Sequence, residues 1–393
     1  MTIMITRRQF IATAPGLLGS ALVISGCSQE SESDSYEAVA GRTWRLGALS
    51  GEGGKSGTSG ISGAVLSREL VRYATLAPSS HNTQCWKFAL GGDGHAITIL
   101  PDLSRRCPAV DPDDHHLFVS LGCAAENLVQ AALAHGLKGE VSFDATRDAV
   151  RVALAPVPAQ ATPLFNAIAS RQCTRGDYDG KPLSSAELTL LERAGTSKDV
   201  HMLLITERTA MEGVLDQVVQ ANTAQMADPA FVKELKTWIR FNGTEAVRTG
   251  DGLFSATTGS PAIPTWLGEL AFGWLLRAKS ENDKYARQIR SSGGIAVFIG
   301  QAADKAHWVE VGRSYERFAL QATALGIRNA FVNQPVEVRS LRPQFAAAIG
   351  LADQRPDLVV RFGRGPTMPS SLRRPVQAVM VRAGVAEEKA ERG

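Results

Sequence analysis

The chain has 393 residues, of which 44% are hydrophobic and 21% are charged. These values are ordinary for a soluble globular protein, and the length allows two domains or one internally duplicated domain with a sizeable core. The formal net charge is +3, and loss of residues 1–27 would remove two arginines and no acid, leaving +1. A nearly neutral chain has no electrostatic basis for binding nucleic acid, so we expect no nucleic-acid partner.

The N-terminal segment, 1–27, has the pattern of an export signal. Residues 6–11, TRRQFI, form a twin-arginine signature, and the apolar stretch 11–24 is too short and too broken for a membrane span of about 20 residues. Residues 23–27, VISGC, are similar to a lipobox, in which Cys27 would be lipidated. We therefore predict export by the twin-arginine route to the periplasmic or cell-surface side, with membrane attachment only through Cys27. An ordinary apolar leader with a chance cysteine is the alternative.

Residues 28–63 are rich in Ser, Glu and Gly, a composition that predicts a flexible linker. Four more cysteines follow Cys27, and an oxidising compartment would permit disulfides between them. Their spacing gives no CxxC or zinc-binding pattern, so the pairing stays open. These cysteines are Cys85, Cys107, Cys123 and Cys173.

Residues 64–157 are predicted to form the first half of the folded part. Apolar residues recur there at helical spacing in two segments and in short strand-like runs elsewhere. The predicted elements are a helix over 66–77 ended by Pro78, strands over 86–90 and 96–100, a helix over 116–135 capped by Gly136, and a strand over 149–154. The Pro/Ala-rich stretch 155–163 is the clearest domain boundary in the sequence.

The second half, residues 163–393, carries a diluted copy of the first. One constant shift along the chain aligns Gly122 with Gly312 and Glu126 with Glu316, and it also aligns the glycines that follow both helices. These matches predict a duplicated helix–cap–strand unit, although two similar amphipathic helices could also arise independently. Strands are predicted over 295–300 and 357–363.

Between the halves, residues 222–268 fit no copy of the repeat. Apolar residues at helical spacing over 231–241 are followed by breaks at 250–252 and 259–261. So long an insertion is typical of a lid over a binding site. A peripheral helical pair that only stabilises the second half is the alternative, and the sequence leaves both open.

Two motifs occur once each and are far apart in the chain. Residues 77–84, APSSHNTQ, form a turn-forming run with short polar side chains and free backbone groups. Arg171 and Arg175 are two cations four residues apart, a spacing that suits one phosphate. Because neither motif has a second copy, we expect one composite binding site per chain.

With these motifs in this order, the chain resembles the flavin-dependent nitroreductase family, and within it the exported, tandem-repeat Acg-like branch. The resemblance implies an α+β, nitroreductase-like fold in which the two halves of one chain form an internal pseudo-dimer, with a lid-like insertion. It also implies one FMN per chain, bound between the halves. The segments that carry it are 77–84, 171–175, the two Gly-Glu helices, 234–240, and 361–363 through 373–375.

The resemblance also implies which residues would hold FMN. The phosphate would be held by Arg171, Cys173, Arg175, Arg373 and Arg374, with Cys173 standing where the family usually has a hydroxyl. The flavin ring and ribityl chain would be lined by Ser79, Ser80, Asn82 and Gln84, and the backbone near flavin N5 would come from Asn333, Gln334 and Pro335. In the insertion, Trp238, Arg240 and Phe241 would cover the ring as a lid.

Residues 111–116, DPDDHH, offer metal-ligand types, but adjacent histidines on a helix diverge by about 100°. A helix N-cap by Asp113 or Asp114 explains the run better, so no metal is predicted. The first functional hypothesis is an exported FMN-binding oxidoreductase that passes hydride or electrons through flavin N5 from an unknown donor to a small acceptor, with no side chain assigned as catalytic. The alternative is a flavin-sequestering protein with little turnover, and a third is an interaction lipoprotein without flavin.

Overall fold

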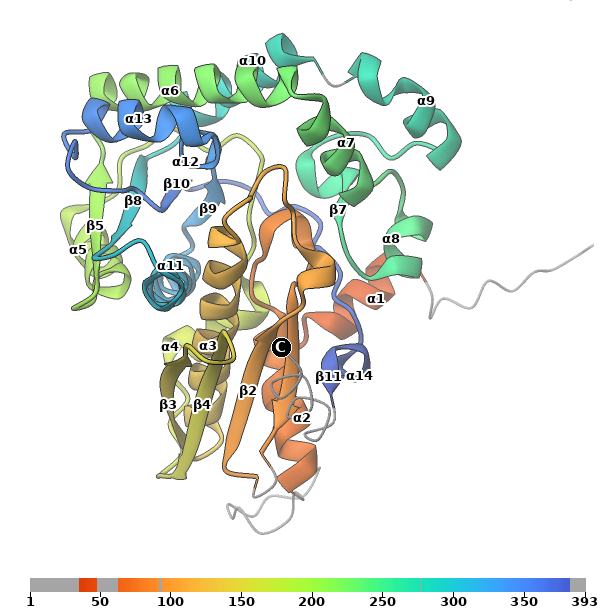
Figure 1. The fold of residues 1–393 in the computed structure, drawn as a ribbon, viewed down its shortest axis with the longest axis vertical. Helices are drawn as coiled ribbons and strands as arrows, with labels where there is room; N and C mark the ends of the chain where they lie inside the picture. The colour runs from red at the N-terminus through yellow and green to blue at the C-terminus, as the bar shows by residue number, and fades with distance from the viewer. Residues whose placement is uncertain (1–34, 48–62, 92–93, 276, 382–393) are drawn as a thin grey trace, which may run out of the picture.

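The computed structural model describes residues 35–47, 63–91, 94–275 and 277–381. Most strands lie in two antiparallel sheets of the same internal order (Figure 1). The first sheet runs β1 (Trp86–Leu90), β2 (Ala96–Pro101), β4 (Ala149–Pro156) and β3 (Leu137–Asp144), with the short β11 (Met380–Val381) added parallel to β1. The second runs β5 (Val200–Ile205), β8 (Gly294–Gly300), β10 (Leu358–Gly363) and β9 (Arg328–Phe331).

Helices occupy equivalent places in the two units. A helix precedes the first strand of each sheet, and a 20-residue helix joins the second strand of each sheet to the third. These helices are α2 (Gly63–Thr75) and α3 (His115–Ala134) in the first unit, and α5 (Ser185–Gly195) and α11 (Lys305–Ala324) in the second. The predicted α+β fold class is confirmed, and the repeated order of elements supports the predicted duplication.

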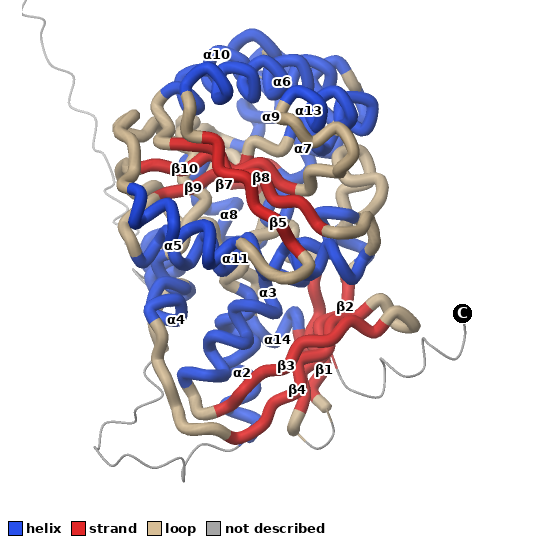
Figure 2. The backbone as a smooth tube through the Cα atoms, turned by 90° about the vertical axis from the view of Figure 1, so that its left-hand side faces the viewer, coloured by secondary structure: helices blue, strands red, loops and turns tan. Residues whose placement is uncertain are grey.

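The two long helices α3 and α11 pack against each other at the centre of the molecule, between the sheets (Figures 1 and 2). Both contribute to one continuous hydrophobic core, in which Leu121, Leu128 and Phe318 are fully buried. Although α3 is long and apolar enough to cross a bilayer, 83% of its most apolar stretch is buried inside the protein, as a core helix requires. The core therefore joins the two halves into one body.

The start of α3 differs from its prediction. Asp114 occupies the N-cap position, but it has φ of 58° and its side chain makes no capping hydrogen bond. The capping carboxylate is Asp111, whose Oδ2 accepts from the Leu117 backbone N–H at 3.0 Å. The left-handed turn at Asp114 brings Asp111 back over the helix end, and a local reading of the sequence cannot show that turn.

The segment between β5 and β8 is larger than the predicted insertion of 222–268. It extends from residue 206 to residue 293, where the first unit has only a short hairpin turn between β1 and β2. It contains α6 (Arg208–Ala227), α7 (Pro229–Trp238), α8 (Gly243–Thr249), α9 (Thr265–Leu275) and α10 (Ala278–Arg290), with the two-residue strands β6 (Ile239–Arg240) and β7 (Leu253–Phe254). A smaller addition between β9 and β10 holds α12 (Gln334–Glu337) and α13 (Arg342–Ala348).

The prediction of a flexible linker over residues 28–63 is wrong for residues 36–43, which the structure describes as a helix. Residues 36–43 form α1 (Tyr36–Thr43), which is capped by the Ser35 side chain and packs on α8. The Tyr36 ring lies 4.6 Å from the Phe254 ring, and the Trp44 indole N–H donates to the Ser371 carbonyl at 2.9 Å. These two aromatic residues hold the segment, a contribution that the Ser/Glu-rich composition conceals. The predicted signal peptide, with Cys27, lies outside the described residues.

The C-terminal segment crosses to the other half. Residues 163–393 were predicted to form the second unit, which begins with α4 (Pro163–Ala167). Yet β11 pairs with β1 of the first sheet, and α14 (Val376–Val379) packs on α2. The chain between β10 and α14 therefore runs along the boundary of the two units, where the binding residues were predicted.

Candidate functional site

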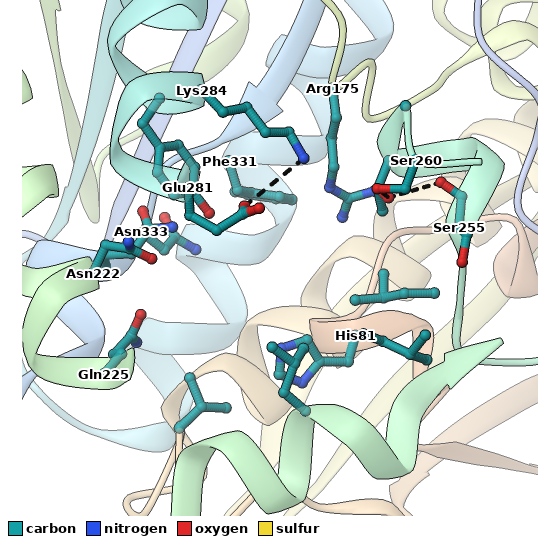
Figure 3. A pocket seen from close by; sticks show the side chains of 18 of the residues that line it. His81, Arg175, Asn222, Gln225, Ser255, Ser260, Glu281, Lys284, Phe331 and Asn333 are labelled. Atoms are coloured by element: carbon teal, nitrogen blue, oxygen red, sulfur yellow. Dashed lines mark hydrogen bonds and ion pairs between the residues drawn. The ribbon is translucent and has the colours of Figure 1, made fainter. Parts of the chain in front are cut away.

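A cavity of about 1040 Å³ lies between the first unit, the second unit and the insertion (Figure 3). Its walls come from the loop before β1, the first half of α3, the segment after Thr174, the end of β9, and helices α6, α7, α9 and α10. Residues 78–81 and Arg175, which belong to the two separate sequence motifs, therefore line the same cavity. This is the arrangement expected if the two motifs form one composite site. The cavity is large enough for a ligand of cofactor size.

The predicted turn 77–84 forms one wall of the cavity. Ser79 and Ser80 line it, and the Ser79 hydroxyl oxygen accepts from the Gln84 backbone N–H at 2.9 Å. His81, Asn82 and Gln84 all have φ near +50°, a conformation that non-glycine residues rarely adopt. The surrounding structure must therefore hold this loop in place.

Asn82 and Gln84 are two of the residues that do so. The Asn82 amide donates to the carbonyls of Gly252 and Leu372, at 3.0 and 3.2 Å. The Gln84 amide donates to the Gly250 carbonyl at 2.8 Å, and its oxygen accepts from the Arg374 backbone N–H. Both side chains are buried and turn away from the cavity, so the structure places them as supports of the loop.

Arg171 does not line the cavity. Its guanidinium is buried, donates to the Leu76 carbonyl at 2.9 Å, and lies 3.2 Å from a carboxylate oxygen of Glu316. Burial raises the pKa of Glu316 to about 7, although Arg171 acts in the opposite direction. Cys173 lies between Arg171 and Tyr315, with its sulfur 3.9 Å from Nη1 and 4.0 Å from the phenol oxygen.

Arg373 is also occupied by the chain itself. Its side chain donates to the carbonyls of Thr75, Leu76 and Ala77 at 2.7 to 3.1 Å, and to Asn82 Oδ1 at 3.0 Å. The Trp44 ring lies 4.8 Å from its guanidinium carbon. The Arg374 guanidinium donates to the carbonyl oxygens of Gln84 and Ala378. Three of the four arginines predicted to hold phosphate therefore fix the loop instead of facing the cavity.

Arg175 is the predicted arginine that reaches the cavity. Its guanidinium points into the space beside Lys284 and Glu281 of α10 (Figure 3). The Lys284 ammonium lies 3.8 Å from Glu281, whereas no carboxylate forms an ion pair with Arg175 among the residues that the structure describes. Burial lowers the pKa of Lys284, and Arg175 adds to that shift. Cations and carboxylates alternate at this end of the cavity, and Arg175 is a cation there that has no ion pair within the described residues.

The segment after β9 supplies polar groups on another side. Asn333 lines the cavity, although its Oδ1 accepts from the Val359 backbone N–H at 2.8 Å. Gln334 also lines it, and its buried Oε1 has no hydrogen-bond partner within the described part of the chain. An unpaired buried acceptor costs about 1–3 kcal/mol, and this oxygen has almost no exposed surface through which a ligand in the cavity would reach it. Pro335 is buried behind them and does not contact the cavity.

Of the three predicted lid residues, Phe241 alone lines the cavity, where its ring packs against Phe272 of α9 with centroids 6.3 Å apart. Arg240 is buried and donates to Asp251 Oδ1 at 2.6 Å. The other oxygen of Asp251 accepts from Arg105 of the first unit. Trp238 lies against Arg105, with the guanidinium carbon 5.2 Å from its ring. Arg240 and Trp238 therefore fasten the insertion to the first unit.

Several cavity residues were not assigned to the site from the sequence. His81 belongs to the predicted loop 77–84, although no definite role was assigned to it from the sequence. It lines the cavity, and burial, assisted by Arg175 and His116, lowers its pKa to about 4, so the ring is neutral at pH 7. Lys284 and Glu281 lie in a charged stretch of α10 that looks like an ordinary solvated helix face. The apolar wall comes from the insertion, which has no copy in the first half, so no repeat could reveal its role. It includes Phe231, Leu235, Ile263, Leu267 and Phe272.

The run at residues 111–116 is more compact than predicted. One ligand atom from each of Asp111, His115 and His116 lies within 4.8 Å of the others, and all three residues are buried. The two imidazole rings lie 4.6 Å apart at a 31° tilt, so they nearly stack rather than diverge. His115 Nε2 lies 3.0 Å from Asp357 Oδ1. The four described cysteines are all free thiols.

No protein-family model matches the chain. Solved structures align with part of it: a putative nitroreductase from Anabaena variabilis is 10% identical, covers 69% of each chain and has a TM-score of 0.40. The FMN-dependent nitroreductase NfnB from Mycobacterium smegmatis, solved in complex with NADPH, is 13% identical, with 57% of this chain and 96% of that chain covered and a TM-score of 0.35.

Sequence similarity to curated proteins extends over most of the chain. "Putative NAD(P)H nitroreductase Rv3131" of Mycobacterium tuberculosis is 25% identical over 345 residues, which is 85% of this chain and 96% of that protein. "Putative NAD(P)H nitroreductase acg" of the same organism is 23% identical over 323 residues, or 79% of this chain and 94% of its own length. The chain is thus similar, over 79–85% of its own length and 94–96% of theirs, to two mycobacterial proteins that carry the name of putative NAD(P)H nitroreductases.

Proposed function

We propose that the protein is an FMN-binding oxidoreductase of the nitroreductase type, with one flavin in the cavity between its two units. The observation that carries the proposal is the convergence of residues 78–81, Arg175 and Gln334 on one large cavity. The similarity, over 79–85% of this chain, to proteins named putative NAD(P)H nitroreductases supports it. A flavin would supply the redox chemistry, accepting and releasing hydride or electrons.

The side chains of the cavity fit the polar edge and phosphate of FMN. Arg175 offers charge-assisted hydrogen bonds to a phosphate, and no described carboxylate lies within ion-pair distance of it. The Gln334 side chain lines the cavity, and a side-chain amide suits the mixed donor and acceptor edge of an isoalloxazine ring. Ser79 and Ser80 present hydroxyl groups on the loop that Arg171 and Arg373 hold. In this proposal those two arginines position the loop, and Arg175 carries most of the phosphate binding.

The protein itself would bind and orient the flavin and keep water away from it. Phe241 and Phe272 close the cavity on the insertion side. His81, neutral at pH 7, would hold one proton on its imidazole inside the cavity. We also propose that the chain is exported by the twin-arginine route and lipid-anchored at Cys27, as its N-terminal segment predicts; this route suits a protein that folds around its cofactor before export.

Anaerobic reduction tests the oxidoreductase proposal. Purified protein loaded with FMN should lose its flavin absorption on addition of NADPH or NADH, and regain it when a nitroaromatic or another small acceptor is added. Dithionite serves as the control, because it reduces flavin without a specific binding site. Protein that takes up no FMN would contradict the proposal.

A flavin-sequestering protein is the second candidate, and the apolar wall favours it. The insertion covers one side of the cavity with Phe231, Leu267 and Phe272, and hydride transfer needs a donor to stack on the ring. Flavin that dithionite bleaches, but that neither nicotinamide nucleotides nor small acceptors change, would favour this function.

A further inference from the structure

Helix α9 (Thr265–Leu275) carries the most exposed apolar surface of the described chain. Glu269 is its only charged residue in eleven. Trp266 is 68% exposed and Leu270 is 79% exposed, and their i,i+4 spacing places them on one face. Other large exposed apolar side chains, such as Val65 and Leu103, are scattered singly over distant elements, and such isolated residues are normal on protein surfaces.

The opposite face of α9 packs against the rest of the protein. Ala271 and Phe272 line the cavity, and Phe272 packs edge-to-face on Phe241. Leu267 lies between the two faces, because it lines the cavity and is also 37% exposed. The start of α9 is fixed by Asn242, whose amide donates to the Thr265 hydroxyl at 3.0 Å. The helix is therefore held with one apolar face inward while Trp266 and Leu270 stay in contact with solvent.

We propose that this exposed face of α9 docks on a lipid bilayer. Tryptophan and leucine on one side of a helix are the residues that insert into the interface between lipid headgroups and acyl chains. A second copy of the chain fits less well, because these two side chains supply far less than the ~800 Å² per partner of a stable protein interface. Shallow insertion into lipid needs only a few apolar side chains.

The start of the described chain lies close to the same helix. A Cβ on Gly243, the first residue of α8, would lie 3.3 Å from the Tyr36 side chain of α1, and the preceding residue, Asn242, holds Thr265 of α9. Figure 1 shows α1, α8 and α9 along one side of the molecule. Cys27 is eight residues before Ser35, which is at most about 28 Å of extended chain.

A lipid anchor at Cys27 and α9 would therefore reach the same membrane surface. One acyl chain gives only marginal membrane binding, and stable attachment takes a second signal; α9 supplies that signal. The attachment also differs from the sequence-based expectation, in which the anchor was the only membrane contact. It does not depend on flavin binding or on turnover.

Vesicle flotation of the chain lacking residues 1–27 tests the proposal, because this chain has neither the apolar leader nor a site for an acyl anchor. We expect it to float with phosphatidylcholine vesicles. The double variant Trp266→Ser, Leu270→Gln should lower the vesicle-bound fraction roughly tenfold or more, since each apolar side chain removed is a large part of the buried area. The control is Val65→Gln, Leu103→Gln, which removes apolar side chains that are 53% and 56% exposed on other elements and should bind as before.

A second measurement follows Trp266 directly. Vesicles of brominated phosphatidylcholine should quench part of the tryptophan fluorescence, and Trp266→Phe should remove that part while the protein stays bound. The proposal is overturned if the chain lacking residues 1–27 does not bind vesicles, or if its α9 variant binds as well as the control. A concentration-dependent dimer that only the α9 substitutions abolish, without vesicle binding, would assign the face to a second copy and also overturn it.

Discussion

Gly122 of α3 and Gly312 of α11 make the same contact from opposite sides of one helix crossing. A Cβ added to Gly122 would lie 2.0 Å from the backbone oxygen of Val309. A Cβ added to Gly312 would lie 2.0 Å from the backbone oxygen of Val119. The shift that relates the two glycines also relates the two valines, so the contact is self-complementary in the manner of a two-fold dimer interface. The chain is an internal pseudo-dimer at its centre.

This relationship predicts that Gly122→Ala and Gly312→Ala destabilise the protein by similar amounts, about 2 kcal/mol or more each, because the new methyl group forces the helix backbones apart. Denaturant unfolding of both variants measures the change in the free energy of unfolding. The double variant should cost less than the two single changes together, since the helices separate only once.

Gly213→Ala is the matched control for these two variants. Gly213 lies in helix α6, and a Cβ there would meet nothing within 4 Å. Alanine should stabilise this position by roughly 0.5–1 kcal/mol, because it favours the helical backbone more than glycine does. Equal effects at all three positions would contradict the close crossing.

A second prediction concerns Glu316 and the pH dependence of stability. Its pKa rises from an ordinary value of 4.5 to about 7 in the folded protein, so the folded state holds this proton more tightly than the unfolded state. The stabilising contribution is fully present below about pH 4.5 and is lost as pH rises to about 7. The free energy of unfolding of the wild type, relative to Glu316→Gln, should therefore fall over this range. A difference that stays constant with pH would contradict the assignment.

A third prediction separates Arg175 from the other arginines of the sequence motif. Arg175→Ala should weaken FMN binding by about 10- to 100-fold, the loss expected when a charge-assisted hydrogen bond is removed. The thermal stability of the flavin-free protein should hardly change, because the guanidinium has no ion-pair partner among the described residues. Flavin titration followed by fluorescence measures the effect, with Arg193→Ala on the exposed face of α5 as the control.

Arg171→Ala should behave differently. It frees the Leu76 carbonyl and removes the cation beside the buried Glu316, which then keeps its proton, so the flavin-free protein itself should lose stability, by about 1–3 kcal/mol. If Arg171→Ala removed flavin without any loss of stability, the direct phosphate role predicted from the sequence would be correct and the positioning role would be wrong.

A fourth prediction concerns the attachment of the insertion. Asp251 accepts from both Arg105 and Arg240, so it joins the first unit to the insertion. Asp251→Ala should destabilise the protein by about 3 kcal/mol, because it leaves the largely buried Arg240 without a counter-ion. Glu140→Ala, which breaks a solvent-exposed pair with Lys138, should cause no measurable change. Similar effects for both would show that Asp251 does not fasten the insertion.

Local patterns predicted the first unit well. The helices α2 and α3 and the strands β1, β2 and β4 begin and end within a few residues of their predicted bounds, because helical periodicity, turn residues and caps lie within each segment. The internal repeat could be recognised in the sequence because the close crossing of α3 and α11 needs a glycine in both copies, at Gly122 and Gly312.

The sequence could not show which arginines face the cavity and which bind backbone carbonyls of the protein itself. Arg171, Arg175 and Arg373 look equally suited to a phosphate in the sequence, yet two of them bond to the carbonyls of residues 75–77. Those carbonyls are free to accept from side chains because helix α2 ends at Thr75 and the chain turns at Pro78. The arginines that bind them lie far along the chain, so no local pattern shows the contact. Likewise, nothing local shows that Trp44 packs over Arg373 or that α10 brings Lys284 to the cavity.

The number of flavins bound per chain tests the central claim most directly. Full-length protein saturated with FMN, freed of excess ligand and then denatured, releases its flavin for measurement against protein concentration. A single composite cavity in a pseudo-dimer predicts one FMN per chain. Two per chain would mean that each unit keeps a site of its own, and none would mean that the cavity holds something other than flavin.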